Sequence, residues 1–183
     1  MASIKHLLEM HGLEVFHARP IPSHGGSIRV YAARRGTHNV QPSVARMLAA
    51  EPRGEALSKR LASFQHDVIL SKLRLLSMLR DLKEKGARVA GISAPSRAST
   101  LVNYVGLDEG LIDYVCEIPG SLKIGKCMPG TAIPVVDEAK LFDDQPDCAI
   151  IFSWHIADEL APKLKAKGFR GKLITPLPVP RFL

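Results

Sequence analysis

The sequence predicts an α/β protein, in which a three-layer domain with a mostly parallel sheet and flanking helices follows a helix and a β-hairpin. Three observations support this prediction. Beyond residue 86, short apolar runs alternate with helix-like segments, which is typical of parallel sheets covered by helices. Apolar residues recur at helical spacing over 55–85. Before residue 43, two strand-like runs flank a pair of glycines, which indicates a hairpin.

The first piece of the chain is a helix followed by a hairpin. We expect the helix over 3–11, with Gly12 as its C-cap. The strands are expected over 13–21 and 27–34, joined by the turn 22-PSHGG-26. An isolated hairpin is only marginally stable and leaves its strand edges open. We therefore expect this piece to be the remnant of a larger sheet, whose other strands lie in a longer protein or in another chain.

A connector and a long helix follow the hairpin. The polar stretch 34–42 and a short helix over 44–50 lead to the turn 51-EPRG-54. The long helix is expected over 55–85, and Gly86 ends it. The apolar positions that set its period are Leu57, Leu61, Phe64, Val68, Leu75, Leu79 and Leu82.

The remainder of the chain alternates strands with helices, which predicts a mostly parallel sheet. Strands are expected over 88–92, 112–117, 147–153 and 172–175, helices over 97–105 and 156–167, and a Gly- and Pro-rich loop through Pro134. The chain is thus expected to divide into a helix and hairpin over 1–36, a connector over 37–54, and an α/β domain over 55–183.

Composition argues against several classes of protein. The formal charge is +7, but a 5% aromatic content and the lack of a basic run or a known motif argue against nucleic-acid binding. No apolar run is long enough for a membrane span, and no apolar segment near the N-terminus indicates a secretory signal. The three cysteines, Cys116, Cys127 and Cys148, lack metal-site spacing, so no metal and no disulfide framework are expected. A reducing cytoplasm fits this usage best.

The stretch 88-RVAGISAPSRASTLVNYVG-106 has the strand–loop–helix layout of a nucleotide-binding unit. Aligned from Gly91, the later glycines of the dinucleotide fingerprint become Ser93 and Ser96, which argues against tight NAD-type binding. The start of the helix still offers N–H groups and a positive dipole end to an anion. Hydroxyl groups and a guanidinium suited to phosphate come from Ser93, Ser96, Ser99, Thr100 and Arg97. The alternative is that Ser96 only caps the helix and Arg97 faces solvent.

A second loop, 119-PGSLKIGKCMPGTAIPV-135, is expected at the same edge of the sheet, where ligands bind in open α/β folds. Lys123 and Lys126 offer positive charge, and Thr131 offers an exposed hydroxyl after a tight turn. The alternative is a structural connection with solvated lysines.

A third loop begins in 152-FSWHIADEL-160. Trp154 is either a platform for a ligand or a core residue. His155 and Glu159, four residues apart, are expected on one helical face. His155 either hydrogen-bonds a substrate or is structural.

Five stretches carry a resemblance to a known family: 24-HGGSIR-29, 91-GISAPSRASTLVNYVG-106, 129-PGTAIPV-135, 146-PDCAIIFSWHIADEL-160 and 176-PLP-178. In this order they resemble the C-terminal part of S-adenosylmethionine-dependent sugar C-methyltransferases, which act on nucleotide-linked deoxysugars. The resemblance implies a Rossmann-like C-terminal domain preceded by the end of a methyltransferase domain. It also implies that a hairpin motif closes the sheet of that methyltransferase domain, and the residues of this motif are His24, Gly25, Gly26 and Arg29.

The resemblance further implies a division of labour within the family. The family's zinc-binding module, its S-adenosylmethionine loop and its catalytic Glu-His pair would fall before Met1, so no catalytic residue is expected here and the chain alone is expected to be inactive. The implied ligand is a nucleotide-linked sugar, and the implied partner is a methyltransferase domain in the same native protein or in another chain. The residues implied to face the sugar nucleotide are Arg97, where lysine is common, Thr100, Asn103, Tyr104 and Thr131. Glu117 stands where aspartate is usual, and His155 where asparagine is usual.

Three functions are compared on these grounds. The first is the nucleotide-sugar-binding portion of a methyltransferase, and the second is a stand-alone nucleotide-sugar-binding or scaffold module without catalysis. The third is an oxidoreductase, which the missing glycines and the absence of an acidic residue at the expected strand end disfavour. A continuous upstream reading frame that encodes a glycine-rich cofactor loop favours the first function over the second.

The hairpin also predicts self-association, because its apolar side chains and open edges need a partner. The apolar residues are Leu13, Val15, Phe16, Ile21, Ile28, Val30 and Tyr31. We expect a homodimer joined through 13–34, and the rival is that the helix over 55–85 covers the apolar face. Light scattering tests this: a dimer abolished by deleting 1–36 supports pairing. A monomer at high concentration, with its hairpin protected from proteolysis, contradicts it.

Overall fold

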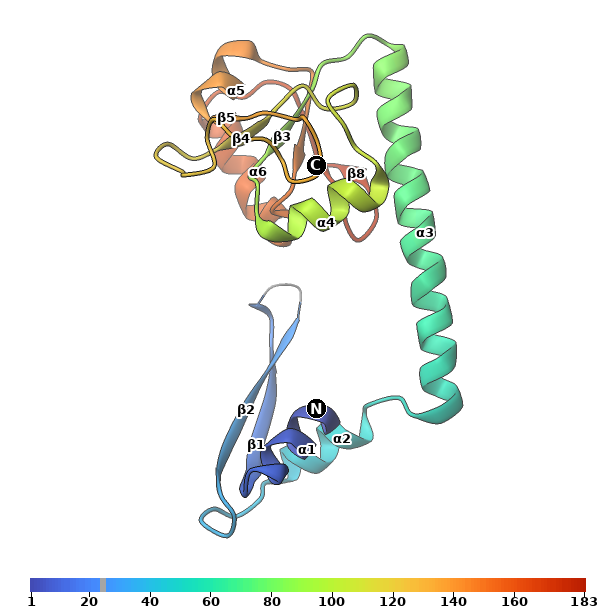
Figure 1. The fold of residues 1–183 in the computed structure, drawn as a ribbon, viewed down its shortest axis with the longest axis vertical. Coiled ribbons are helices and arrows are strands. Elements are labelled where there is room, and N and C mark those ends of the chain that lie inside the picture. Colours follow the sequence, from blue (N-terminus) through green and yellow to red (C-terminus); the bar gives the residue numbers. More distant parts are fainter. Residues whose placement is uncertain (24–25) are drawn as a thin grey trace. The chain divides into compact units, whose positions relative to one another are not determined.

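The computed structural model describes residues 1–23 and 26–183, so His24 and Gly25 of the hairpin motif lie outside the described residues. The chain forms two compact units, Met1–Gln65 and His66–Leu183. The long helix α3 (Gly54–Glu84) contributes residues to both units (Figure 1). None of the helices in the described ranges is long and apolar enough to cross a membrane.

The first unit contains the expected helix and hairpin. Helix α1 (Ala2–Met10) ends before Gly12, whose φ of +72° places it in the left-handed region that favours glycine. Strands β1 (Leu13–Ile21) and β2 (Ser27–Arg34) pair in antiparallel fashion, which confirms the hairpin. Helix α2 (Pro42–Ala49) begins with a proline at its first position, where the missing N–H costs no hydrogen bond.

A β-bulge organises the buried face of the hairpin. The register shifts between Val15 and His17, which leaves Phe16 without a partner on β2. The Phe16 carbonyl instead accepts the Gln41 N–H at 2.8 Å. Because of the extra residue, Val15 and Ala18 face the same side, where both are buried and where α1 and α2 contact β1. Two short helices therefore cover part of the hairpin's apolar face, which the sequence-based prediction did not anticipate.

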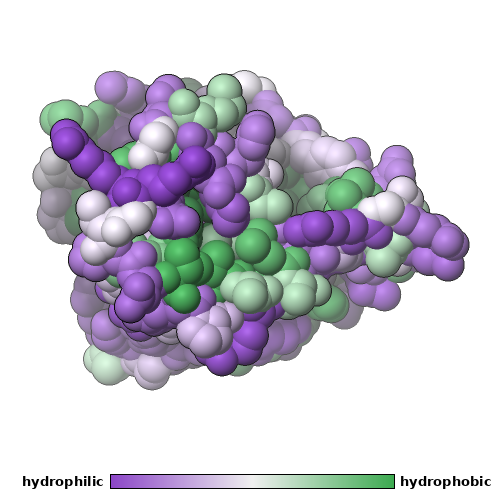
Figure 2. Space-filling view, turned by 90° about the horizontal axis from the view of Figure 1, so that it is seen from below, coloured by the Kyte–Doolittle hydropathy of each residue, from purple (hydrophilic) through white to green (hydrophobic). Residues whose placement is uncertain are grey.

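One face of α1 remains exposed. Ile4, Leu7 and Met10 lie three residues apart on this helix and are all exposed, and no residue of α1 is buried. In Figure 2, hydrophobic residues (green) are exposed between hydrophilic ones (purple) on the face of the molecule that is shown. Residues at this spacing share one side of a helix, so they form an apolar face that is available to a partner.

The second unit is built on a six-stranded sheet of order β5-β4-β3-β6-β7-β8, in which only the β7–β8 pair is antiparallel. This confirms the predicted α/β class with a mostly parallel sheet. Its elements in chain order are β3 (Val89–Ile92), α4 (Ser96–Val105), β4 (Val115–Glu117), β5 (Val135–Asp137), α5 (Ala139–Asp144), β6 (Cys148–Ile151), the 3₁₀ helix η2 (Trp154–Ile156), α6 (Ala157–Ala166), β7 (Lys172–Thr175) and β8 (Arg181–Phe182).

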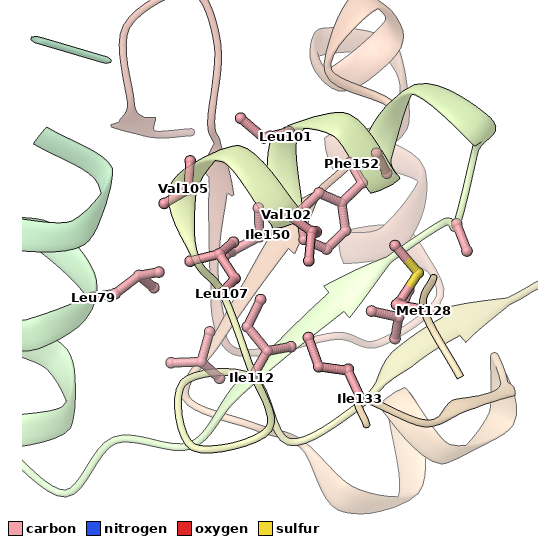
Figure 3. Close-up of a cluster of buried hydrophobic side chains, with 14 of the residues drawn as sticks. Leu79, Leu101, Val102, Val105, Leu107, Ile112, Met128, Ile133, Ile150 and Phe152 are labelled. Atoms are coloured by element: carbon pink, nitrogen blue, oxygen red, sulfur yellow. The ribbon is translucent and has the colours of Figure 1, made fainter. Parts of the chain in front are cut away.

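Helices cover both faces of this sheet, which gives three layers. Alternate strand residues point to opposite faces. Val89 and Ile150 belong to a cluster with residues of α3 and α4, whereas Ala90 and Ile151 belong to a cluster with residues of α5 and α6. Figure 3 shows the first cluster, in which the Phe152 ring lies beneath α4.

Three short elements, β5, α5 and β8, were missing from the sequence-based prediction. Strand β5 has three residues and β8 has two, so neither is long enough to show an alternating pattern, and α5 has only six residues. The helix expected over 156–167 is also different. It is split into η2 and α6, because Ile156 has a φ of −124° that interrupts the helical path. His155 and Glu159 therefore do not share one α-helical face, and that prediction was wrong.

Cysteine reactivity follows from the same core. Burial raises the pKa of the Cys116 thiol to about 12 and also raises the pKa of Cys148, whereas Cys127 is exposed. We expect iodoacetamide at pH 8 to label Cys127 alone in the folded chain and all three thiols after denaturation. As pH rises above about 9, the unfolded thiols ionise before the buried ones, so stability falls. Peptide mapping checks the labelling, and denaturation at pH 8 and 10 checks the change in stability. Rapid labelling of Cys116 in the folded chain contradicts both predictions.

Candidate functional site

The strand order has its topological switch point between β3 and β6. The chain leaves β3 toward β4 on one side, whereas β6 continues toward β7 on the other. Ile92 and Ile151 are paired at the ends of the two strands, so residues 93–95 and 152–155 start at the same level of the sheet. In open α/β sheets, ligands bind at this point, beyond the carboxyl ends of the strands.

The loop after β3 has a strained start. Ser93 has a φ of +67°, in a region that serine rarely adopts, and its N–H donates to the Cys116 carbonyl at 2.8 Å. Such conformations persist where the surrounding structure holds them, often at ligand sites. Gly91 has a different role from a fingerprint glycine. A Cβ at Gly91 would lie 2.7 Å from the Phe152 ring, so this position requires glycine for packing.

Two side chains meet at this switch point. The Arg97 guanidinium, in the first turn of α4, lies 5.8 Å from the centre of the Trp154 ring. This geometry is a cation–π contact, so Arg97 does not simply face solvent. Ser96 is the first residue of α4 and is exposed, and Pro95 occupies the N-cap position without a side-chain cap. The alternative role of Ser96 as a helix cap is therefore wrong. On the other side of the switch point, His155 follows Trp154 in η2.

Glu117 and Lys123 enclose the backbone of Ala94. The Glu117 Oε1 accepts the Ala94 N–H at 2.5 Å, and the Lys123 Nζ donates to the Ala94 carbonyl at 2.8 Å. Lys123 and Glu117 also form an ion pair of 3.3 Å. Glu117 is the last residue of β4, so an acidic side chain does stand at the end of the second strand. The expectation that no acidic residue stands there was wrong, because β4 ends on Glu117 itself.

Other predicted site residues lie away from the switch point. Asn103 is seven residues beyond Ser96 on α4, or about 10 Å along the helix, and it donates to the Pro129 carbonyl at 2.8 Å. Thr131 is half-buried rather than exposed, and its hydroxyl donates to the Met128 carbonyl at 3.0 Å. Both line a separate surface hollow of about 690 Å³.

The remaining predicted residues are dispersed. Thr100 is exposed one turn into α4, and the Tyr104 ring lies 5.2 Å from the Lys72 Nζ of α3. Arg29 pairs with Arg19 across the hairpin, and both lower the pKa of Tyr31 through hydrogen bonds to its hydroxyl, Arg19 most. Within the described residues, no three His, Cys, Asp or Glu side chains gather in a way that could hold a metal ion.

Asn103 is expected to hold a turn rather than a ligand. Its side-chain amide joins α4 to Pro129, and a Cβ at Gly130 would lie 2.1 Å from its Oδ1. Asn103→Ala is expected to lower the free energy of unfolding by about 1 kcal/mol and to leave nucleotide affinity unchanged. Chemical denaturation and calorimetry check the two effects, and a loss of affinity without a loss of stability would reverse this assignment.

The fold defines the class first: this is a Rossmann-like α/β domain with polar loops at the switch point of its strand order. The family described as the C-methyltransferase C-terminal domain matches residues 22–178, so the chain belongs to this family. The chain is 32% identical over 188 aligned residues to the C-methyltransferase NovU of Streptomyces niveus. The alignment covers all of the chain and 44% of that relative, so the chain spans less than half of the relative's length.

Proposed function

We propose that this chain is the nucleotide-sugar-binding portion of an S-adenosylmethionine-dependent sugar C-methyltransferase. The observation that carries the proposal is the contact of Arg97 with Trp154 at the switch point between β3 and β6, where the strained Ser93 starts the loop after β3. Membership of the C-methyltransferase C-terminal domain family supports it. A nucleotide sugar needs a diphosphate site beside an apolar surface, and these residues supply both.

The diphosphate is assigned to the start of α4. The N–H groups in the first turn of a helix and its positive dipole end favour an anion there. Arg97 lies in this turn and can place a planar guanidinium against phosphate oxygens. Trp154 offers a flat ring next to it, and His155 offers a hydrogen-bonding side chain to the sugar.

Methyl transfer is assigned to a methyltransferase domain, in the same native protein or in another chain. The exposed apolar face of α1, formed by Ile4, Leu7 and Met10, is a surface that such a domain could cover. Residues 1–12, which precede the hairpin, contain no glycine-rich cofactor loop. On this proposal it holds the nucleotide sugar, and the methyltransferase domain holds the methyl donor.

Calorimetric titration tests the proposal. The full chain is titrated separately with UDP-glucose, dTDP-glucose, free glucose and S-adenosylmethionine. We expect saturable binding of at least one nucleotide sugar, negligible binding of free glucose, and negligible binding of S-adenosylmethionine. Tight binding of S-adenosylmethionine, or binding of neither nucleotide sugar, contradicts the proposal.

A further inference from the structure

The Ala94 peptide is held from both sides. Its N–H is hydrogen-bonded by Glu117 and its carbonyl by Lys123, and these two side chains are themselves paired. We call these three residues the Ala94 clamp. The clamp lies between the strained Ser93 and the first turn of α4, so it fixes the backbone on which the proposed diphosphate site is built.

The clamp places a carboxylate beside an anion site. The Glu117 side chain is only 11% exposed, and its Oε1 is 2.5 Å from the backbone nitrogen that lies two residues before α4. Like charges repel more strongly where water is largely excluded. A diphosphate at the start of α4 would therefore be repelled by Glu117 unless a cation compensates its charge.

Lys123 is positioned to provide that compensation. Two of the hydrogen bonds that its ammonium group can donate go to the Ala94 carbonyl and to Glu117. From the sequence, Lys123 was expected to offer its positive charge to a ligand at this edge of the sheet. The observed contacts give it a different role, because its charge is directed toward the loop and toward Glu117.

We propose that Lys123 is a positioning residue, which neutralises Glu117 and holds the Ala94 peptide so that the loop accepts an anionic ligand. This inference rests on the proposed function, since it concerns the same diphosphate site. It assigns Lys123 to the loop rather than to the ligand, and it assigns Glu117 to the Ala94 N–H.

A double-mutant cycle tests the charge relation. The full chain and its Lys123→Met, Glu117→Gln and doubly substituted variants are titrated with UDP and with dTDP. Lys123→Met alone is expected to weaken binding about tenfold or more, because Glu117 is left uncompensated. In the Glu117→Gln background, the same substitution is expected to change affinity by less than about threefold.

The cycle separates the two roles of Lys123. If the double variant binds as weakly as Lys123→Met alone, Lys123 contacts the ligand directly and the proposal is overturned. Unchanged affinity in Lys123→Met overturns it as well. Lys140→Met is the matched control, since Lys140 is similarly exposed at 47% and pairs with Asp144 at 3.0 Å; it should bind like the unmodified chain.

Amide hydrogen exchange tests the clamp without any ligand. Glu117→Ala is expected to speed exchange of the Ala94 N–H about tenfold or more, whereas the Ile92 N–H within β3 should keep its rate. Unchanged exchange at Ala94 rules out the clamp. If the unmodified chain binds neither UDP nor dTDP but Ala94 exchange responds, the proposed function fails while the clamp itself is supported.

Discussion

Phe152→Ala is expected to lower the free energy of unfolding of the second unit by about 3–5 kcal/mol. The ring is fully buried under α4, in the cluster that joins this helix to the sheet (Figure 3). Its removal leaves a cavity that the neighbouring strands can fill only in part. Denaturation followed by the fluorescence of Trp154, which belongs to this unit, measures the loss. Leu122→Ala is the control, because Leu122 is 88% exposed and should change stability by less than about 0.5 kcal/mol.

A second substitution tests whether the Phe152 ring limits the room for a side chain at position 91. A Cβ there would lie 2.7 Å from Phe152 Cε2 and 2.8 Å from Val115 Cγ2, so Gly91→Ala alone should cost about 1–3 kcal/mol. Combined with Phe152→Leu, which shortens the side chain, it should cost less than the sum of the two single changes. Strict additivity would mean that the ring does not limit Gly91.

Arg97→Ala is expected to weaken binding of a nucleoside diphosphate by about 1.5–3 kcal/mol, through loss of a charge-assisted hydrogen bond to phosphate. UDP and dTDP titrations of the full chain measure this effect. Arg97→Lys should retain part of the affinity, because it keeps the charge but not the planar fork. Arg170→Ala serves as the control for a general loss of positive charge, since Arg170 is exposed beyond α6. Unchanged affinity in Arg97→Ala would remove Arg97 from the site.

The strand–loop–helix unit from β3 to α4 could be predicted because its signals are local. A short apolar run is followed by a polar loop and then by amphipathic spacing, and Gly106 ends the helix with a φ of +84°. The positions of Ser93 and Arg97 followed from this unit. The bulge at Phe16 could not be predicted, because its consequence depends on a hydrogen bond from Gln41 on a later segment.

The parts of the site that were missed are contacts between segments. Glu117 reaches Ala94 only because β3 and β4 are neighbours in the sheet, and Lys123 joins them from the loop that follows β4. Asn103 was assigned to a ligand, yet it faces a turn that lies twenty-six residues further along the chain. Sequence spacing says which polar residues follow a strand. It does not say which of them already hydrogen-bond one another.

The brevity of β5 and β8 has a consequence for how this chain behaves when concentrated. These strands form the two borders of the six-stranded sheet, and they contain only three and two residues. Such short borders give a neighbouring molecule little template for adding a strand, which protects against aggregation. The hairpin is different, because within the described residues β1 and β2, of nine and eight residues, pair only with each other. Ordered self-assembly or misassembly should therefore start at the hairpin, and the α/β unit should stay dispersed.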